Sequence, residues 1–226
     1  QVVAEGATII DLGGYSSRPG AEEVSTEQEW ERVSRALSVV QDVAPDVVVS
    51  VDTFRSEVAR RSIEQAGAII VNDISAGEAD AAMVDVVAHY GVPYVAMHMR
   101  GTPQTMQQHI GYERGVVAEV ADYFRRRTEW LRERGVKDII LDPGFGFAKS
   151  VEQNYELLAG LGALQTEGCP LLVGLSRKSM IYKPLGITPE ESLPGSLALA
   201  WEALRGGNAI LRVHDVAEAA RTVALY

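Results

Sequence analysis

The segment VVVSVDT, at residues 47–53, is nearly continuous in valine and ends close to an acid, Asp52. A strand buried on both faces of a parallel sheet has this pattern, whereas a strand with one solvent face alternates apolar and polar residues. Further runs of this kind are separated by longer amphipathic segments, and together they give the expected strands Ala7–Gly13, Val47–Thr53, Ile69–Ser75, Tyr94–Met99, Asp138–Asp142, Leu171–Ser176 and Ala209–His214. The alternation predicts an α/β protein with a parallel sheet.

The amphipathic segments between these runs are expected to be helices. In Ser25–Val43, apolar residues recur at spacings of three and four, and Ser25 with Gln28 matches a capping box at the start. The segment Glu113–Arg134 has the same periodicity, and its arginine run at 125–127 is interpreted as a solvated face rather than a binding patch.

Two architectures fit this order of elements, a closed barrel and an open doubly wound sheet. The open sheet that binds nucleotides usually has a GxGxxG turn after its first strand, and Gly13, Gly14 and Gly20 do not have that spacing. Residues Gln1–Glu5 resemble the last turns of a helix that ends at a glycine. We therefore predict a (β/α)8 TIM barrel whose first strand is missing from this chain.

Composition limits the classes of partner. The 226 residues, 46% of them hydrophobic, suit one domain over residues 1–226. The formal net charge of −10 argues against a nucleic-acid partner, because neutralising phosphates needs clustered Lys and Arg. No apolar run approaches the roughly 18 residues that span a bilayer, so no membrane partner is expected. Cys169 is the only cysteine, which fits a reducing cytosolic compartment.

Polar residues end nearly every expected strand. In a parallel barrel the carboxyl ends of the strands meet at the face where ligands bind. These residues are Asp11, Asp52, Asn72, Asp73, His98, Asp142, Ser176, Arg212 and His214. A single aspartate at such a place is as often a loop cap as a ligand contact. Several buried carboxylates near one axis are costly unless cations or a ligand satisfy them, so the whole set favours a site.

Two groups of side chains differ in the ligand that they suit. Guanidinium and imidazole groups donate to phosphate oxygens, and they occur at Arg18, Arg212 and His214. Carboxylate and amide groups pair with the edges of a flat nitrogen heterocycle, and they occur at Asp52, Asn72 and Asp142. The sequence therefore indicates a phosphorylated substrate that carries a nitrogen-rich ring.

Two loops add to this picture. DPGFGFAK, at residues 142–149, places Phe145 and Phe147 between glycines, where apolar rings serve poorly as core. One ring could face a planar substrate, and the alternative is a loop anchor. GLSRK, at residues 174–178, puts Lys178 where it could bind a carbonyl oxygen, although a lone surface lysine would be unremarkable. Motifs for zinc hydrolysis, an esterase elbow or a P-loop are absent from the sequence.

The chain resembles the dihydropteroate synthase family along nearly its whole length. The segments that carry the resemblance follow the expected strands in order, and they are DLGGYSSRPGA (11–21), VSVDTFR (49–55), VNDIS (71–75), MHMRGTPQTMQ (97–107), DPGFGFAK (142–149), GLSRKSMI (174–181) and RVHD (212–215). The resemblance implies a transferase of folate biosynthesis that condenses 6-hydroxymethyl-7,8-dihydropterin diphosphate with 4-aminobenzoate, giving 7,8-dihydropteroate and pyrophosphate. It also implies a cytoplasmic homodimer in a family that sulfonamides target.

The resemblance also implies roles for individual residues. The pterin would be held by Asp52, Asn72, Ile74, Met97, Asp142, Gly174 and Lys178. The diphosphate would be bound by Arg212 and His214. The aminobenzoate would be bound by Ser17, Arg18, Pro19, Phe147, Lys178 and Ser179. Catalysis would fall to Lys178, Arg212 and Asp142. Mg²⁺ is the implied cofactor, and its expected ligand is an Asn in an N-terminal loop, so no metal ligand is expected in this chain.

Two departures and two alternatives accompany the resemblance. Tyr15 stands where many members have an acidic residue, and GSLALAW at residues 195–201 replaces a Thr-rich stretch.

One alternative is the methyltetrahydrofolate-binding domain of corrinoid methyltransferases, which shares the carboxylate and amide set. Lys178 and Arg18 argue against it, because a methyl donor needs no diphosphate cradle. The other alternative is a non-catalytic pterin-binding module, which the missing strand and loop would favour.

Overall fold

The computed structural model describes residues 1–16, 22–102, 105–166, 168–207 and 209–226. The described chain divides into two compact units. The β1–β4 unit comprises Thr8–Met97 and Arg127–Ile140, and the β6–β7 unit comprises Gln1–Ala7, His98–Arg126 and Leu141–Tyr226.

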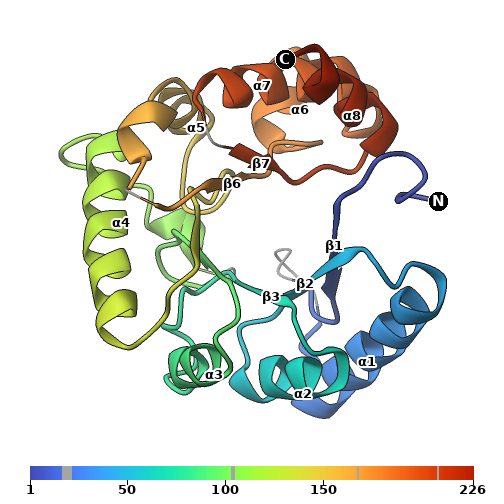
Figure 1. Cartoon of the computed structure of the whole chain (residues 1–226). Helices are drawn as coiled ribbons and strands as arrows, with labels where there is room; N and C mark the ends of the chain where they lie inside the picture. Colours follow the sequence, from blue (N-terminus) through green and yellow to red (C-terminus); the bar gives the residue numbers. More distant parts are fainter. Residues whose placement is uncertain (17–21, 103–104, 167, 208) are drawn as a thin grey trace. The chain divides into compact units, whose positions relative to one another are not determined.

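The β1–β4 unit contains parallel strands joined by helices. Its strands are β1 (Ile9–Gly13), β2 (Val48–Asp52), β3 (Ile70–Asp73) and β4 (Tyr94–Met97). Its helices are α1 (Thr26–Val43), α2 (Ser56–Ala66) and α3 (Met83–Tyr90). Neighbouring strands pair in parallel, and the register sets Asp52 against Asn72 at the ends of β2 and β3. The three helices lie along one side of the strands (Figure 1).

The β6–β7 unit repeats this pattern. Its strands are β6 (Leu171–Val173) and β7 (Ala209–Leu211), which pair in parallel. Its helices are α5 (Val151–Ala159), α6 (Ser179–Leu185), α7 (Leu193–Arg205) and α8 (Val216–Leu225). Three short 3-10 helices are Met106–Gln108, Leu161–Leu164 and Glu190–Ser192. Strand β5 (Ile139–Asp142) and helix α4 (Val116–Glu133) belong in part to each unit. The sheet order is β1 to β7, as the sequence predicted for a parallel α/β protein.

The ends of the strands differ from the prediction. All the expected strands form, but β6 and β7 end at Val173 and Leu211 rather than at Ser176 and His214. The polar residues that follow them leave the ladder, and after β6 the chain turns through Arg177, which adopts a φ of 56°. The polar residues after β6 and β7 therefore lie in loops, and their side chains are not part of the sheet.

Helix α1 confirms one prediction and adds a residue that the sequence did not single out. Ser25 Oγ accepts from the Gln28 N–H at 3.2 Å, and Gln28 Oε1 accepts from the Ser25 N–H at 2.9 Å, so the capping box forms. Glu29 is wholly buried and accepts from Thr53 Oγ1 at 2.6 Å and from Arg55 Nη1 at 2.5 Å. A buried carboxylate needs such donors. Among the helices of the described ranges, none is both long and apolar enough to cross a membrane.

Non-glycine residues with positive φ occur in loops that follow strands. Among the residues that the structure describes, they are Ala76 (51°), Ala148 (49°) and Arg177 (56°). This region of backbone space is uncommon for residues with a Cβ, and it persists only where surrounding contacts hold it. The loops after β3, β5 and β6 are therefore held in shape by their surroundings rather than by local preference.

Candidate active site

Asp142 ends β5 and faces several cations. Its Oδ1 accepts from the Gly144 N–H at 2.7 Å. Burial raises the pKa of the Asp142 carboxyl above its ordinary value, and the charges of Lys178 and Arg212 oppose that rise. Burial lowers the pKa of Lys178 to about 8, although the Asp142 charge raises it. Lys178 is therefore mostly protonated at neutral pH, and its charge and that of Asp142 act on each other.

Lys178 is held against the loop after β5. Its Nζ donates to the Phe145 carbonyl oxygen and lies 5.3 Å from the centroid of the Phe147 ring, within the range of a cation–π contact. A side chain at Gly174 would meet this lysine, since a Cβ there would lie 3.9 Å from Lys178 Nζ. The absence of a side chain at Gly174 therefore leaves room beside the amine.

The two phenylalanines of this loop differ. Phe145 is wholly buried and packs as core, so the prediction that both rings serve poorly as core was wrong for Phe145. The loop turns back on itself because Gly144 and Gly146 adopt φ values of 67° and 83°. Phe147 stays half-buried beside Lys178 and is the ring available to a ligand.

The loops after β6 and β7 are joined by side chains. The backbone N–H of His214 donates to Ser176 Oγ at 3.3 Å, and His214 Nδ1 lies 3.1 Å from the same oxygen. Arg177 donates to both carboxylate oxygens of Asp215, at 3.2 and 2.5 Å. Arg212 and His214 are both exposed. This arrangement presents a guanidinium and an imidazole from a braced loop.

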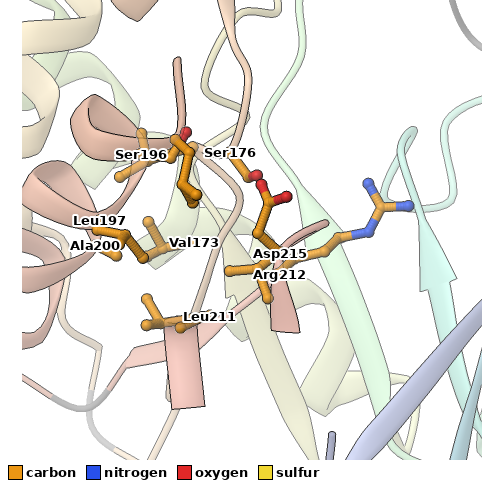
Figure 2. Close-up of a pocket in the computed structure, with 12 residues that line it drawn as sticks. Val173, Ser176, Ser196, Leu197, Ala200, Leu211, Arg212 and Asp215 are labelled. Carbon is orange, nitrogen blue, oxygen red and sulfur yellow. The ribbon is translucent and has the colours of Figure 1, made fainter. Parts of the chain in front are cut away.

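An apolar cavity lies beneath this loop, between β6, β7 and α7. It is lined by Val173, Leu197, Ala200 and Leu211 among others, and its volume is about 10 Å³. That is about the room that one water molecule needs, so no heterocycle fits there. The Arg212 side chain extends away from the cavity (Figure 2). The guanidinium of Arg212 therefore points away from this small cavity (Figure 2).

In the β1–β4 unit, polar side chains end neighbouring strands as predicted. Asn72 is buried, and its Nδ2 donates to Asp11 Oδ2 at 3.1 Å. Asp52 lies beside Asn72 in the ladder and is half-buried. Ile74 and Met97 are buried. These strand ends therefore present a carboxylate and an amide beside an apolar surface.

Asp73 has a different role from the one that the sequence suggested. It is wholly buried and accepts from Tyr94 Oη at 2.7 Å, from both the N–H and the hydroxyl of Ser75 at 2.7 Å, and from the Gly77 N–H at 2.8 Å. Its grouping with the ligand-facing residues was wrong, because its own turn and β4 occupy its oxygens. Asp73 orders the turn after β3.

Comparison with known proteins agrees with this geometry. Residues 1–214 match the family described as pterin binding enzyme. The dihydropteroate synthase of Escherichia coli strain K12 is 46% identical over 221 residues, which cover 96% of this chain and 76% of that protein. This chain belongs to the dihydropteroate synthase family of pterin-binding enzymes.

Solved structures of this family share the fold. The Yersinia pestis dihydropteroate synthase, in a sulfonamide drug complex, is 39% identical with a TM-score of 0.91, covering 99% of this chain and 81% of that chain. The Burkholderia cenocepacia dihydropteroate synthase, complexed with 7,8-dihydropteroate, is 38% identical with a TM-score of 0.90, covering 99% of this chain and 82% of that chain. The parallel α/β fold of the described chain is thus the dihydropteroate synthase fold.

The residues that the family resemblance picked out fall into three sets. The β6–β7 unit supplies Gly174, Lys178, Asp142 and Phe147 close together, with Ser179 next to Lys178 in sequence. The same unit supplies Arg212 and His214, both exposed after β7. The β1–β4 unit supplies Asp52 and Asn72. Three residues predicted for the aminobenzoate side lie outside the described residues, namely Ser17, Arg18 and Pro19.

Lys149 is the buried cation that sequence reasoning missed in this dihydropteroate synthase fold. Its side chain is 4% exposed, and its Nζ donates to the Gly144 and Phe147 carbonyl oxygens, both at 3.0 Å. The same Nζ lies 3.1 Å from Nδ1 of His98, which is also buried. The motif DPGFGFAK contains Lys149, but a lysine in a loop usually lies at the surface, so its burial could not be predicted from the motif.

The described side chains do not provide a metal site. In the ranges that the structure covers, no group of three or more His, Cys, Asp and Glu side chains lies close enough to hold a metal ion. Among the strand-end acids, Asp11 accepts from Asn72 Nδ2 and Asp142 accepts from the Gly144 N–H. The described residues therefore form no cluster of acidic and imidazole side chains that would hold Mg²⁺ by itself.

Proposed function

We propose that this chain condenses 6-hydroxymethyl-7,8-dihydropterin diphosphate with 4-aminobenzoate, giving 7,8-dihydropteroate and pyrophosphate in folate biosynthesis. The observation that carries the proposal is the group formed by Asp142, Lys178 and Phe147, in which a carboxylate, an ammonium and a ring adjoin. Relatives of the same fold are described with a sulfonamide drug and with 7,8-dihydropteroate, and these ligands support the choice of substrates.

The pterin ring is matched by hydrogen-bonding groups of complementary kinds. We assign Asp142 to accept from ring N–H and amino groups of the pterin. Lys178, protonated at neutral pH, donates to its carbonyl oxygen or ring nitrogen. The remaining pterin contacts that we propose are Asp52, Asn72, Ile74, Met97 and Gly174.

The diphosphate is assigned to Arg212 and His214. Both side chains are exposed, and the Ser176 hydroxyl orients the imidazole of His214. In the order that we propose, the C–O bond to the diphosphate breaks first, and pyrophosphate leaves with the bonding electrons. Fixed carboxylates such as Asp142 stabilise the electron-poor pterin methylene. The aminobenzoate amine then attacks this carbon and loses a proton.

The aminobenzoate side is assigned to Phe147, Lys178 and Ser179, together with residues 17–19. The Phe147 ring beside the Lys178 ammonium offers an apolar face and a positive charge, which suit an aromatic carboxylate.

Further parts of the proposal rest on the sequence pattern or on the family resemblance. The pattern supports a (β/α)8 TIM barrel and one domain over residues 1–226, and the resemblance supports a Mg²⁺ cofactor, a homodimer and a cytoplasmic location. No step of the reaction above is assigned to Mg²⁺, since the described residues do not form a site for it.

The test is turnover of the two substrates by the purified protein. We expect release of pyrophosphate and formation of 7,8-dihydropteroate, and the Lys178→Ala variant should lose most of this turnover. Calorimetry that detected pterin binding with no pyrophosphate release would leave only a non-catalytic binding module. Methyl transfer from methyltetrahydrofolate to a corrinoid would favour the methyltransferase alternative. Positional isotope exchange tests the order, because ionisation without aminobenzoate is expected.

A further inference from the structure

Lys149 has no part in the reaction proposed above, yet it is a buried cation in the loop after β5. An ammonium group has three N–H donors and no acceptor. Lys149 Nζ lies 3.0 Å from the Gly144 carbonyl oxygen, 3.0 Å from the Phe147 carbonyl oxygen and 3.1 Å from His98 Nδ1. Each N–H of the ammonium therefore has one acceptor.

The loop from Asp142 to Ser150 depends on side chains for its shape. Ala148 has a φ of 49°, which a residue with a Cβ rarely adopts. The Phe145 carbonyl accepts from Lys178, and the Ala148 carbonyl accepts from Tyr112 Oη at 3.0 Å. Lys149 binds the carbonyls of Gly144 and Phe147. Four carbonyls of the loop are therefore held by side chains.

We propose that Lys149 is a positioning residue, which fixes the backbone of Gly144–Phe147 so that the Phe145 carbonyl holds Lys178 and the Phe147 ring lies beside the Lys178 amine. This inference rests on the proposed function, because the position of the Phe147 ring and of Lys178 matters for binding aminobenzoate. Lys149 acts through the loop and contacts neither substrate.

The neighbours of Lys149 make its charge sensitive to pH. Asp142, Lys178, Arg100 and His98 are the ionisable groups that face it. Burial lowers the pKa of Lys149 to about 7, with Lys178 and Arg100 lowering it further and Asp142 raising it. Burial, with the charges of Lys149 and Arg100, lowers the pKa of His98 to about 2, so this imidazole is neutral and its Nδ1 accepts. Above neutral pH the amine loses one N–H, and one of its three acceptors loses its donor.

The first measurement needs no substrate. Hydrogen exchange of the backbone amides in residues 142–150 should be at least tenfold faster in Lys149→Met than in the unaltered protein, with exchange in residues 212–226 unchanged. Lys137→Met is the matched control, because Lys137 is exposed just before β5. Faster exchange throughout the chain would show a general loss of stability and overturn the assignment.

The second measurement separates positioning from a structural role. In Lys149→Met the KM for aminobenzoate should rise about tenfold or more, while kcat falls by less than that. In the unaltered protein the KM for aminobenzoate should rise as pH increases through about 7. That rise should be missing from Lys149→Met. An unchanged KM with unchanged exchange in residues 142–150 would overturn the inference. A fall in kcat that only matches the fall in the amount of folded protein would overturn it too.

A third variant decides the matter if Lys149→Met does not fold. His98→Leu removes one acceptor and leaves the two carbonyl contacts of Lys149, so exchange in residues 142–150 and the KM should each change by a few-fold. No change in either would overturn the inference. If the unaltered protein fails to release pyrophosphate, the proposed function fails, and the exchange measurement still tests whether Lys149 holds the loop.

Discussion

Asp73 and Asp142 are both aspartates at the ends of buried strands, and burial raises the pKa of each carboxyl. Their partners differ. Asp73 accepts from the uncharged donors Tyr94, Ser75 and Gly77, all within reach of its own turn and of β4. Asp142 accepts one N–H, from Gly144, and otherwise faces cations.

This difference separates a carboxylate that orders a turn from one that can meet a ligand. The oxygens of Asp73 are committed to four hydrogen bonds, so no capacity is left for a substrate. The charge of Asp142 is balanced by the side chains of Lys178 and Arg212, which a substrate can approach in turn. Asp142 is therefore the aspartate that can meet a ligand, because its neighbours are cations rather than hydrogen-bond donors of its own turn.

The largest effect is expected from Asp142→Asn. This change keeps the shape and an acceptor for Gly144 but removes the charge that stabilises the electron-poor methylene. Turnover should fall by about 10³-fold, measured as pyrophosphate release. The free energy of unfolding in urea should change by less than about 1 kcal/mol. Asp138→Asn, at an exposed position before β5, is the control that should keep full turnover.

Asp73→Ala should produce the opposite result. Removing this carboxylate leaves the Tyr94 hydroxyl and the Gly77 N–H buried without their acceptor, so the free energy of unfolding should fall by about 3 kcal/mol. Turnover per folded molecule should stay within a few-fold. Asp85→Ala, at an exposed position of α3, is the matched control. Intact stability with lost turnover would move Asp73 back among the ligand contacts.

A smaller loss is expected from Tyr94→Phe. This change removes one of the four hydrogen bonds to Asp73 and leaves the ring in place. The free energy of unfolding should fall by about 1.5 kcal/mol, as for a hydrogen bond to a charged acceptor. Urea unfolding of Tyr94→Phe, Asp73→Ala and the double variant measures the coupling. Additive losses would contradict the assigned bond.

The smallest effect is expected from acid, through His98 beside the loop after β5. The pKa of His98 is about 2 in the folded protein against an ordinary value of 6.5. Because the unfolded chain binds the extra proton between these values, the stability from neutral His98 is full above pH 6.5 and is lost as the pH falls. The unaltered protein should lose about 1 kcal/mol more than His98→Asn between pH 6 and pH 5. Equal slopes in urea unfolding would contradict this.

The sequence was sufficient for the strands and for the capping box of Ser25 and Gln28, because these depend on residues close together in the chain. It placed both Asp73 and Asp142 at strand ends, but it could not predict the partners that give them different roles, because Tyr94 and Lys178 come from other strands and loops. Nor did it predict the burial of Glu29, whose donors, Thr53 and Arg55, come from a distant part of the sequence.

Ala76, Ala148 and Arg177, the residues of positive φ, have a consequence for thermal adaptation. Each such backbone conformation costs on the order of 1 kcal/mol in the folded state, and glycine would remove that cost. Glycine would also enlarge the conformational freedom of the unfolded chain by a comparable free energy. The two effects nearly cancel, so a heat-resistant form of this enzyme gains little at these three loops. Changing any of the three to glycine should therefore leave the free energy of unfolding nearly unchanged, so these loops are not where thermal stability can be gained cheaply.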